Sequence, residues 1–202
     1  MAFTSLELSE IIQIRKIVTI HYFEYMSDYS FPGEKHDFWE FLCVDKGEVD
    51  IIAEDTPYTL RKGQIVFHKP NEFHTVKANG KIAPNLVISF ECDSPYMKYF
   101  ENLITSIGEK ERNLIAQIIY EAKHCILGAL DDPNTTRMVR NPQAPIGAEQ
   151  MIKIYLENLL ISMIRQLNTG NLSSPAIKSM KQKNDAMVYD KITTYLEEHI
   201  RE

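Results

Sequence analysis

Three side chains in the first half of the chain have the types and spacing of a small polar site. His36 and Glu40 lie four residues apart, and His74 ends a Pro-x-x-x-His turn that begins at Pro70. If they converge, two imidazoles and a carboxylate could hold a divalent iron, manganese, nickel or zinc ion with open coordination positions. The same groups could instead contact a small ligand or form a structural hydrogen-bonded pair, so both interpretations stay open.

The elements that must position these side chains are short antiparallel strands. Residues 16–26 are rich in β-branched and aromatic side chains, which favour strands. Residues 36–44 alternate, which places one set of side chains on a common face: His36, Phe38, Glu40, Leu42 and Val44. Because the opposite face is also apolar, we expect this strand to be covered on both sides. A turn signal follows at 45–48, and further short strands are expected at 49–53, 58–60, 64–68, 75–77 and 85–91. This spacing is typical of a β-sandwich or barrel.

The second half of the chain changes to helical periodicity. Ser94-Pro95 is a helix-start signal, residues 109–127 carry one apolar stripe, and residues 131–145 are expected to form a loop. Residues 148–167 are apolar almost all round, which predicts a helix with two buried faces. We predict a homodimer through one of two adjacent faces of this helix, formed by Tyr155, Leu156, Leu159, Leu160, Met163 and Ile164. The alternative is a helix buried wholly within one chain. The fold class is thus predicted to be α+β, an antiparallel β-barrel of the jelly-roll type followed by helices.

Composition limits the class of protein. The formal net charge of −6 argues against nucleic-acid binding by this chain itself, because phosphate contacts require an excess of Lys and Arg. Cys43, Cys92 and Cys125 are odd in number and widely spaced, which favours core residues in a reducing cytoplasm. No signal peptide or membrane span is recognisable, so a cytoplasmic location without a membrane partner is expected.

The motifs and their order resemble a known family. The segment from His36 through Glu40 to Gly47 resembles the first half of a cupin motif, and 63–74 resembles the second. Asn71 stands where this turn commonly has Gly, and Asn tolerates the left-handed conformation. A cupin half, an apolar helix, a polar linker and a final amphipathic helix together resemble the AraC family of bacterial transcription regulators. The resemblance implies four parts: a cupin-like barrel at 1–93, a helical dimerisation region at 94–168, a linker at 169–185, and at 186–202 the first helix of a DNA-binding domain that the chain lacks.

This resemblance implies a non-catalytic function. A small-molecule effector of unknown identity would bind in the barrel, in contact with His36, Phe38, Glu40, Leu42 and His74, and would control attached DNA-binding domains. Leu42 with Phe67 or Val66 could line the cavity, although side chains alone can fill a small barrel. The rival function is a metal-dependent cupin enzyme, a dioxygenase or isomerase. In the metal-binding cupin pattern a further histidine precedes His36 by two positions, where this chain has Glu34, whose carboxylate could replace it. A purely structural oligomerisation module is a third alternative.

Overall fold

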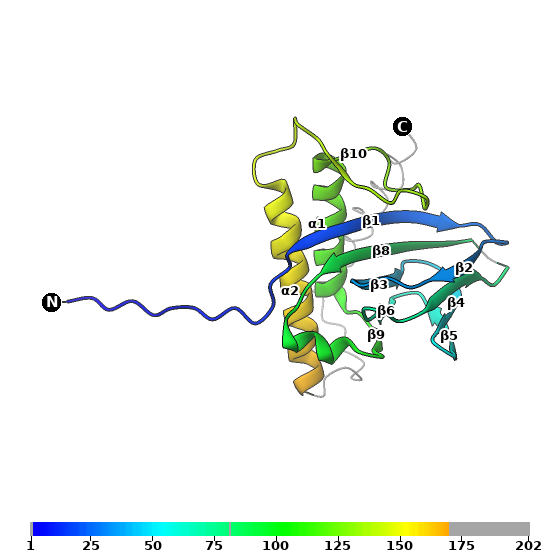
Figure 1. The fold of residues 1–202 in the computed structure, drawn as a ribbon, viewed down its shortest axis with the longest axis horizontal. Coiled ribbons are helices and arrows are strands. Elements are labelled where there is room, and N and C mark those ends of the chain that lie inside the picture. Colours follow the sequence, from blue (N-terminus) through cyan, green and yellow to red (C-terminus); the bar gives the residue numbers. More distant parts are fainter. Residues whose placement is uncertain (1, 81, 170–202) are drawn as a thin grey trace, which may run out of the picture.

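The computed structural model describes residues 2–80 and 82–169 (Figure 1). The predicted helix at 186–202 and the predicted linker after Thr169 lie outside these residues. The strands are β1 (Lys16–Tyr25), β2 (Ser30–Glu34), β3 (Trp39–Val44), β4 (Glu48–Ala53), β5 (Thr56–Arg61), β6 (Gln64–His68), β7 (His74–Ala78), β8 (Ala83–Glu91), β9 (Ile104–Ser106), β10 (Ile126–Leu127) and β11 (Val139–Arg140). The helices are the 3-10 helix η1 (Pro95–Phe100), α1 (Glu109–Cys125) and α2 (Ala148–Thr169).

Two antiparallel sheets make up the barrel. One has five strands in the order β1-β8-β3-β6-β9, and the other has four in the order β2-β7-β4-β5. The turn at 45–48 carries the chain from β3 in the first sheet to β4 in the second, so these two strands are not paired with each other. The predicted α+β class, a barrel followed by helices, is confirmed. The short strands β2, β9, β10 and β11 were not predicted from the sequence.

Apolar side chains form two cores on opposite faces of the five-stranded sheet. In β3, Phe41 and Cys43 join the core shared with the helices, whereas Leu42 and Val44 join the core between the sheets. The prediction that this strand is covered on both sides is therefore confirmed. Its start differs, because β3 begins at Trp39 and His36 lies in the preceding turn.

Helices α1 and α2 lie side by side against the five-stranded sheet (Figure 1). The predicted start signal is confirmed, because the Ser94 side chain accepts a hydrogen bond from the backbone of Tyr96 at the start of η1. Buried Glu111 joins the two long helices. It accepts hydrogen bonds from the Gly108 backbone N–H at 2.9 Å and from the Gln166 side-chain amide at 2.6 Å. Neither helix in the described part of the chain combines the length and apolar character that a membrane span requires.

Candidate functional site

A cluster of four polar side chains lies where β2, β3 and β7 come together. Glu34 ends β2 and pairs in register with His74, the first residue of β7. Glu40 comes from β3, and His36 comes from the turn between β2 and β3. One potential ligand atom from each of the four residues lies within 4.8 Å of the others. The three residues predicted to converge do so, and Glu34 joins them.

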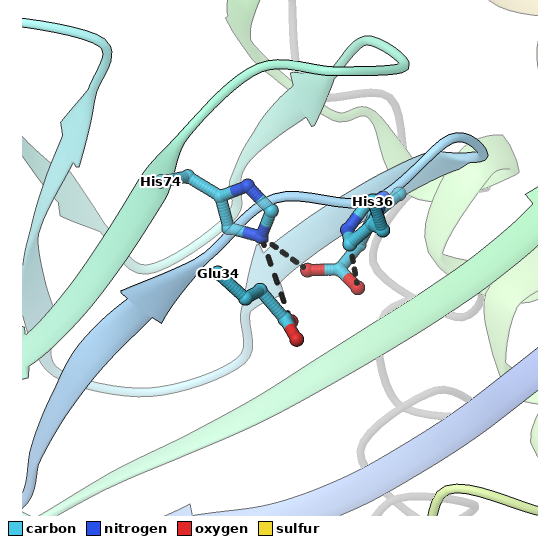
Figure 2. Close-up of side chains that lie close together, drawn as sticks. Glu34, His36 and His74 are labelled. Carbon is cyan, nitrogen blue, oxygen red and sulfur yellow. Dashed lines mark ion pairs between the residues drawn. The ribbon is translucent and has the colours of Figure 1, made fainter.

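The contacts within the cluster are ion-pair distances. Nε2 of His74 lies 3.4 Å from Oε1 of Glu40 and 3.7 Å from Oε1 of Glu34 (Figure 2). Nε2 of His36 lies 3.7 Å from Oε2 of Glu40. Glu40 and His74 are buried, whereas the side chain of Glu34 is 48% exposed. The cluster is therefore buried on the β3 side and open to solvent at Glu34.

Both imidazoles are oriented by backbone carbonyls. Nδ1 of His36 lies 3.0 Å from the Phe38 carbonyl oxygen, and Nδ1 of His74 lies 3.2 Å from that of Glu72. A carbonyl can only accept, so Nδ1 carries the proton and donates in each ring. Nε2 of each ring is buried and, within the part of the chain that the structure describes, meets the ion-pair distances above but no hydrogen bond of normal geometry. Histidine ligands of metals have this arrangement, with one nitrogen fixed by a second hydrogen bond and the other free to coordinate.

The turn that carries His36 is fixed from both ends. The Phe38 ring stacks on the His36 ring, with centroids 3.9 Å apart and planes 6° from parallel. The Asn71 backbone N–H donates to the His36 carbonyl oxygen at 2.6 Å. Asn71 has a φ of 65°, so the expected left-handed residue in the Pro-x-x-x-His turn is confirmed. This turn, rather than the pleat of a strand, aims His36 at the cluster.

Opposite charges stabilise each other at the centre of the cluster. Burial opposes a charge on His74, but the Glu34 and Glu40 carboxylates outweigh it and raise the pKa of His74 to about 10. Burial likewise opposes ionisation of Glu40, but His74 and the hydroxyl of Ser89 together lower its pKa. At neutral pH the pair is therefore an imidazolium beside a carboxylate. A divalent cation would replace the His74 proton, so its affinity would increase with pH.

Sequence reasoning missed the side chains that support Glu40. The Ser89 hydroxyl on β8 donates to Oε2 of Glu40 at 2.7 Å. The Thr19 hydroxyl on β1 in turn donates to the Ser89 oxygen at 2.9 Å. In the sequence, Ser89 lies 49 positions from Glu40 and 70 positions from Thr19. No local motif could have predicted them, because each depends on which strands are neighbours in the sheet.

A second buried pair lies behind His74. The His68 ring stacks on the His74 ring, with centroids 4.1 Å apart, and its Nδ1 lies 2.8 Å from Oε1 of Glu72. Both His68 and Glu72 are at most 2% exposed. Burial lowers the pKa of His68. The sequence analysis did not assign a role to His68, although its spacing of four from Glu72 is a signal that could have identified the pair.

The apolar residues predicted to line a ligand cavity separate into two groups. Leu42 and Val66 lie in the core between the sheets, on the same side of the five-stranded sheet. Phe67, the other candidate, packs in the core shared with the helices. Phe38 is partly exposed beside His36. Only Leu42 and Val66 are therefore placed to line the interior of the barrel, and ligand contact by any of these residues stays a prediction.

The six residues predicted to form a dimer interface lie mainly inside a single chain. Leu156, Leu159, Leu160, Met163 and Ile164 are each at most 4% exposed, and Tyr155 is partly buried. They belong to the core that α2 shares with α1 and the five-stranded sheet. For these side chains the burial favours the alternative, a helix buried within one chain. Pairing of two chains stays a prediction, and its interface would have to use other surfaces.

The family can now be assigned. The sequence matches the family described as AraC-like ligand binding domain over residues 17–140, which is more than half of the chain. The chain belongs to this family. The matched segment contains the barrel, the four-residue polar cluster and α1. An AraC-like ligand binding domain, with two antiparallel sheets followed by two packed helices, is therefore the setting of the cluster.

Individual relatives match shorter segments. The HTH-type transcriptional activator RhaS of Pectobacterium carotovorum subsp. carotovorum is 38% identical over 45 residues, 22% of this chain and 16% of RhaS. The match thus spans far less than two thirds of that relative. Among solved structures, an RmlC-like cupin family protein with a double-stranded β-helix fold from Methanocaldococcus jannaschii is 19% identical. Its TM-score is 0.35, over 45% of this chain and 87% of that one. A cupin superfamily protein from Desulfitobacterium hafniense is 18% identical, with a TM-score of 0.34 over 44% and 74% of the two chains.

Proposed function

We propose that this AraC-like ligand binding domain senses a small-molecule effector and forms a homodimer within a bacterial transcription regulator. The effector would bind at the polar cluster and control attached DNA-binding domains. The observation that carries the proposal is the convergence of His36 and His74 on two carboxylates, with Nε2 of His36 buried and without a hydrogen-bond partner among the described residues. Buried polar atoms without partners are costly, and a ligand that supplies the missing contacts removes that cost.

The chemistry of the cluster favours an effector rich in hydroxyl groups. Two carboxylates accept hydrogen bonds from neighbouring hydroxyls, and the protonated His74 ring donates one. We expect Leu42 and Val66, which lie in the core between the sheets, to provide apolar contact to such an effector. A few convergent polar groups beside an apolar wall is the usual character of a small-molecule site.

Strand β3 provides a route from this site to the helices. Glu40 contacts the cluster from β3, and the adjacent Phe41 packs on the opposite face of the sheet, in the core shared with α1 and α2. A ligand that moves Glu40 therefore changes packing beneath the helices. It controls the protein only if it binds one arrangement of sheet and helices more tightly than the other.

Calorimetry and thermal unfolding with a panel of neutral monosaccharides, polyols and sugar acids test the effector proposal. A compound that stabilises the wild-type chain should lose its effect in His36→Ala and in Glu40→Gln. Glu24→Gln, which changes an exposed carboxylate on β1, is the matched control and should respond as wild type. A stabilising compound whose effect survives both site substitutions would place the effector site elsewhere.

A divalent metal is a second candidate ligand of the same cluster. Two imidazole nitrogens with their other ring nitrogens fixed, together with two carboxylates, match the ligand types of Zn²⁺ and of octahedral Mn²⁺ or Fe²⁺. A bound metal would polarise a coordinated water or ligand oxygen. It is also the precondition of the rival enzymatic function, for which the family assignment gives no support.

Metal analysis of protein purified without a histidine tag tests this second candidate. We expect binding of added Zn²⁺ or Mn²⁺ by wild type, lost in His74→Ala and retained in His124→Ala, whose ring lies on the exposed side of α1. A metal content below about a tenth of an equivalent, with no calorimetric response, would exclude both the metal and the enzyme.

A further inference from the structure

The N-terminal segment of residues 2–10, here called the arm, has no apolar partner among the residues that the structure describes. It is extended, forms neither helix nor strand, and projects from the body of the molecule past α2 (Figure 1). Phe3, Leu6 and Leu8 on this arm are 97%, 86% and 83% exposed. Scattered exposed apolar residues are normal, but here three fall within six residues, and in an extended segment Leu6 and Leu8 share one side. Such exposed apolar surface is favourably removed from water by docking.

The arm leaves the body in a fixed direction. Just after it, Ile12 and Ile14 are each 4% exposed. The Ile14 backbone N–H donates to Oε1 of Glu157 on α2 at 2.9 Å, and the Arg15 backbone N–H donates to the Glu91 carbonyl at 3.0 Å. The chain bends at Ile11, and Ser9 is the one residue of a turn-forming type in residues 9–14. In the structure the arm leads away from β1 of its own chain (Figure 1).

A groove of about 620 Å³, here called the β1 groove, runs beside the start of β1. Its walls are residues 14–17 and Ile20, the short strands β10 and β11 with their flanks, and the first turns of α2. Ile17, Ile126 and Met138 supply apolar lining. Strand β1 is the end strand of the five-stranded sheet. Near its middle the Tyr22 backbone N–H already donates to the Leu130 carbonyl at 2.8 Å, so an added extended segment would pair with the first residues of β1, beside the groove.

The rim of the β1 groove is basic. Four cations line it with a single carboxylate, Glu149, and the cations are Arg15, Lys16, Arg140 and Lys153. Each forms an ion pair within the chain, but their side chains are 42% to 84% exposed. Such exposed pairs contribute little to stability, so the cations can exchange partners when another carboxylate approaches.

We propose that the arm of one chain docks in the β1 groove of a second copy of the chain, and that the exchange is reciprocal. The arm carries apolar side chains and two carboxylates, Glu7 and Glu10, with no Lys or Arg, and so complements an apolar groove with a basic rim. Nine extended residues reach roughly 30 Å, enough to cross a two-fold axis. Reciprocal docking gives both arms equivalent places in a closed dimer. The inference rests on the proposed homodimer and names a surface for it.

Sedimentation velocity of the full chain over a hundredfold concentration range tests the proposal. We expect the wild type to dimerise, and Phe3→Ser/Leu6→Ser/Leu8→Ser to raise the dissociation constant about tenfold or more. Arg140→Glu/Lys153→Glu, which reverses charge on the groove, should weaken the dimer similarly. Met26→Ser is the matched control, because it removes an exposed apolar side chain at the far end of β1 and should leave the constant unchanged.

Mixing the two weakened variants provides the decisive measurement. The arm variant keeps an intact groove and the groove variant keeps an intact arm, so a mixture regains one docked arm per pair. We expect heterodimers to form more tightly than either variant pairs with itself. A wild-type dimer unaffected by the arm substitutions overturns arm exchange and leaves the homodimer standing. A monomeric wild type at every concentration overturns the homodimer as well.

Discussion

Replacing Leu160 by alanine should destabilise the monomer strongly, irrespective of dimer formation. Its side chain is 0% exposed in a single chain, so all three removed carbons leave a dry core. At about 0.8 kcal/mol for each buried methylene, transfer alone costs roughly 2.4 kcal/mol. Incomplete collapse of the cavity raises the loss of unfolding free energy to about 3–4 kcal/mol. Ile154→Ala, at a position 42% exposed on the same helix, should cost at most about 1 kcal/mol.

Urea denaturation at two protein concentrations tenfold apart measures both variants. If Leu160 belongs to the core of one chain, its cost is the same at both concentrations, because the change acts on a unimolecular equilibrium. A cost that increases with protein concentration would place Leu160 at a contact between chains and refute the reasoning. A cost below about 1 kcal/mol at both would contradict its burial.

Three other predictions concern the polar cluster and the thiols. Glu40→Gln should lower the pKa of His74 from about 10, as followed by NMR titration of the imidazole. Because the pKa of His74 is raised in the folded state, its contribution to stability is complete below about pH 6.5 and is lost as pH rises through 10. In urea denaturation of chelator-treated protein, the free energy of unfolding should therefore fall more over this pH range for wild type than for Glu40→Gln. Gly33→Ala should weaken ligand or metal binding by calorimetry, because at φ +110° its Cβ would come within 2.4 Å of the ring of Phe73, which precedes His74 in the chain. Gly63→Ala is the control, because no atom lies within 4 Å of its added Cβ. It should lower stability without changing ligand or metal binding. All three cysteines are buried, and burial raises the pKa of Cys43 to about 12, so a disulfide reagent at pH 8 should label them only after unfolding.

Much of the barrel was predictable because strand periodicity is a local property of the sequence. The alternation in 36–44 indicated a strand with two apolar faces, and β3 has both faces buried. The same alternation extends to residues 36–38, which precede the first residue of the strand, Trp39. His36 therefore seemed to be a strand residue, whereas a turn held by Asn71 and Phe38 directs it inward. A single sequence does not reveal that backbone hydrogen bond from a residue 35 positions away.

Convergence of the cluster was predictable from the cupin-like spacing, but its surroundings were not. The position of Glu34 depends on the pairing of β2 with β7, and the support of Glu40 depends on the neighbours of β3 in the sheet. For α2 the apolar pattern indicated two buried faces without identifying what covers them. Much of that cover comes from the same chain, including Ile12 and Ile14, which lie far from α2 in sequence.

The central position of β3 has a consequence for the dynamics of the domain. It lies between β8 and β6 in the five-stranded sheet, and every one of its residues is buried. Its backbone amides are therefore paired within the sheet and shielded on both faces. Local fraying cannot expose them, so their hydrogens should exchange with solvent only when both cores open together. The amides of Phe41 and Leu42 would then report the global stability of the domain, and a ligand at Glu40 should slow their exchange by the full free energy of its binding.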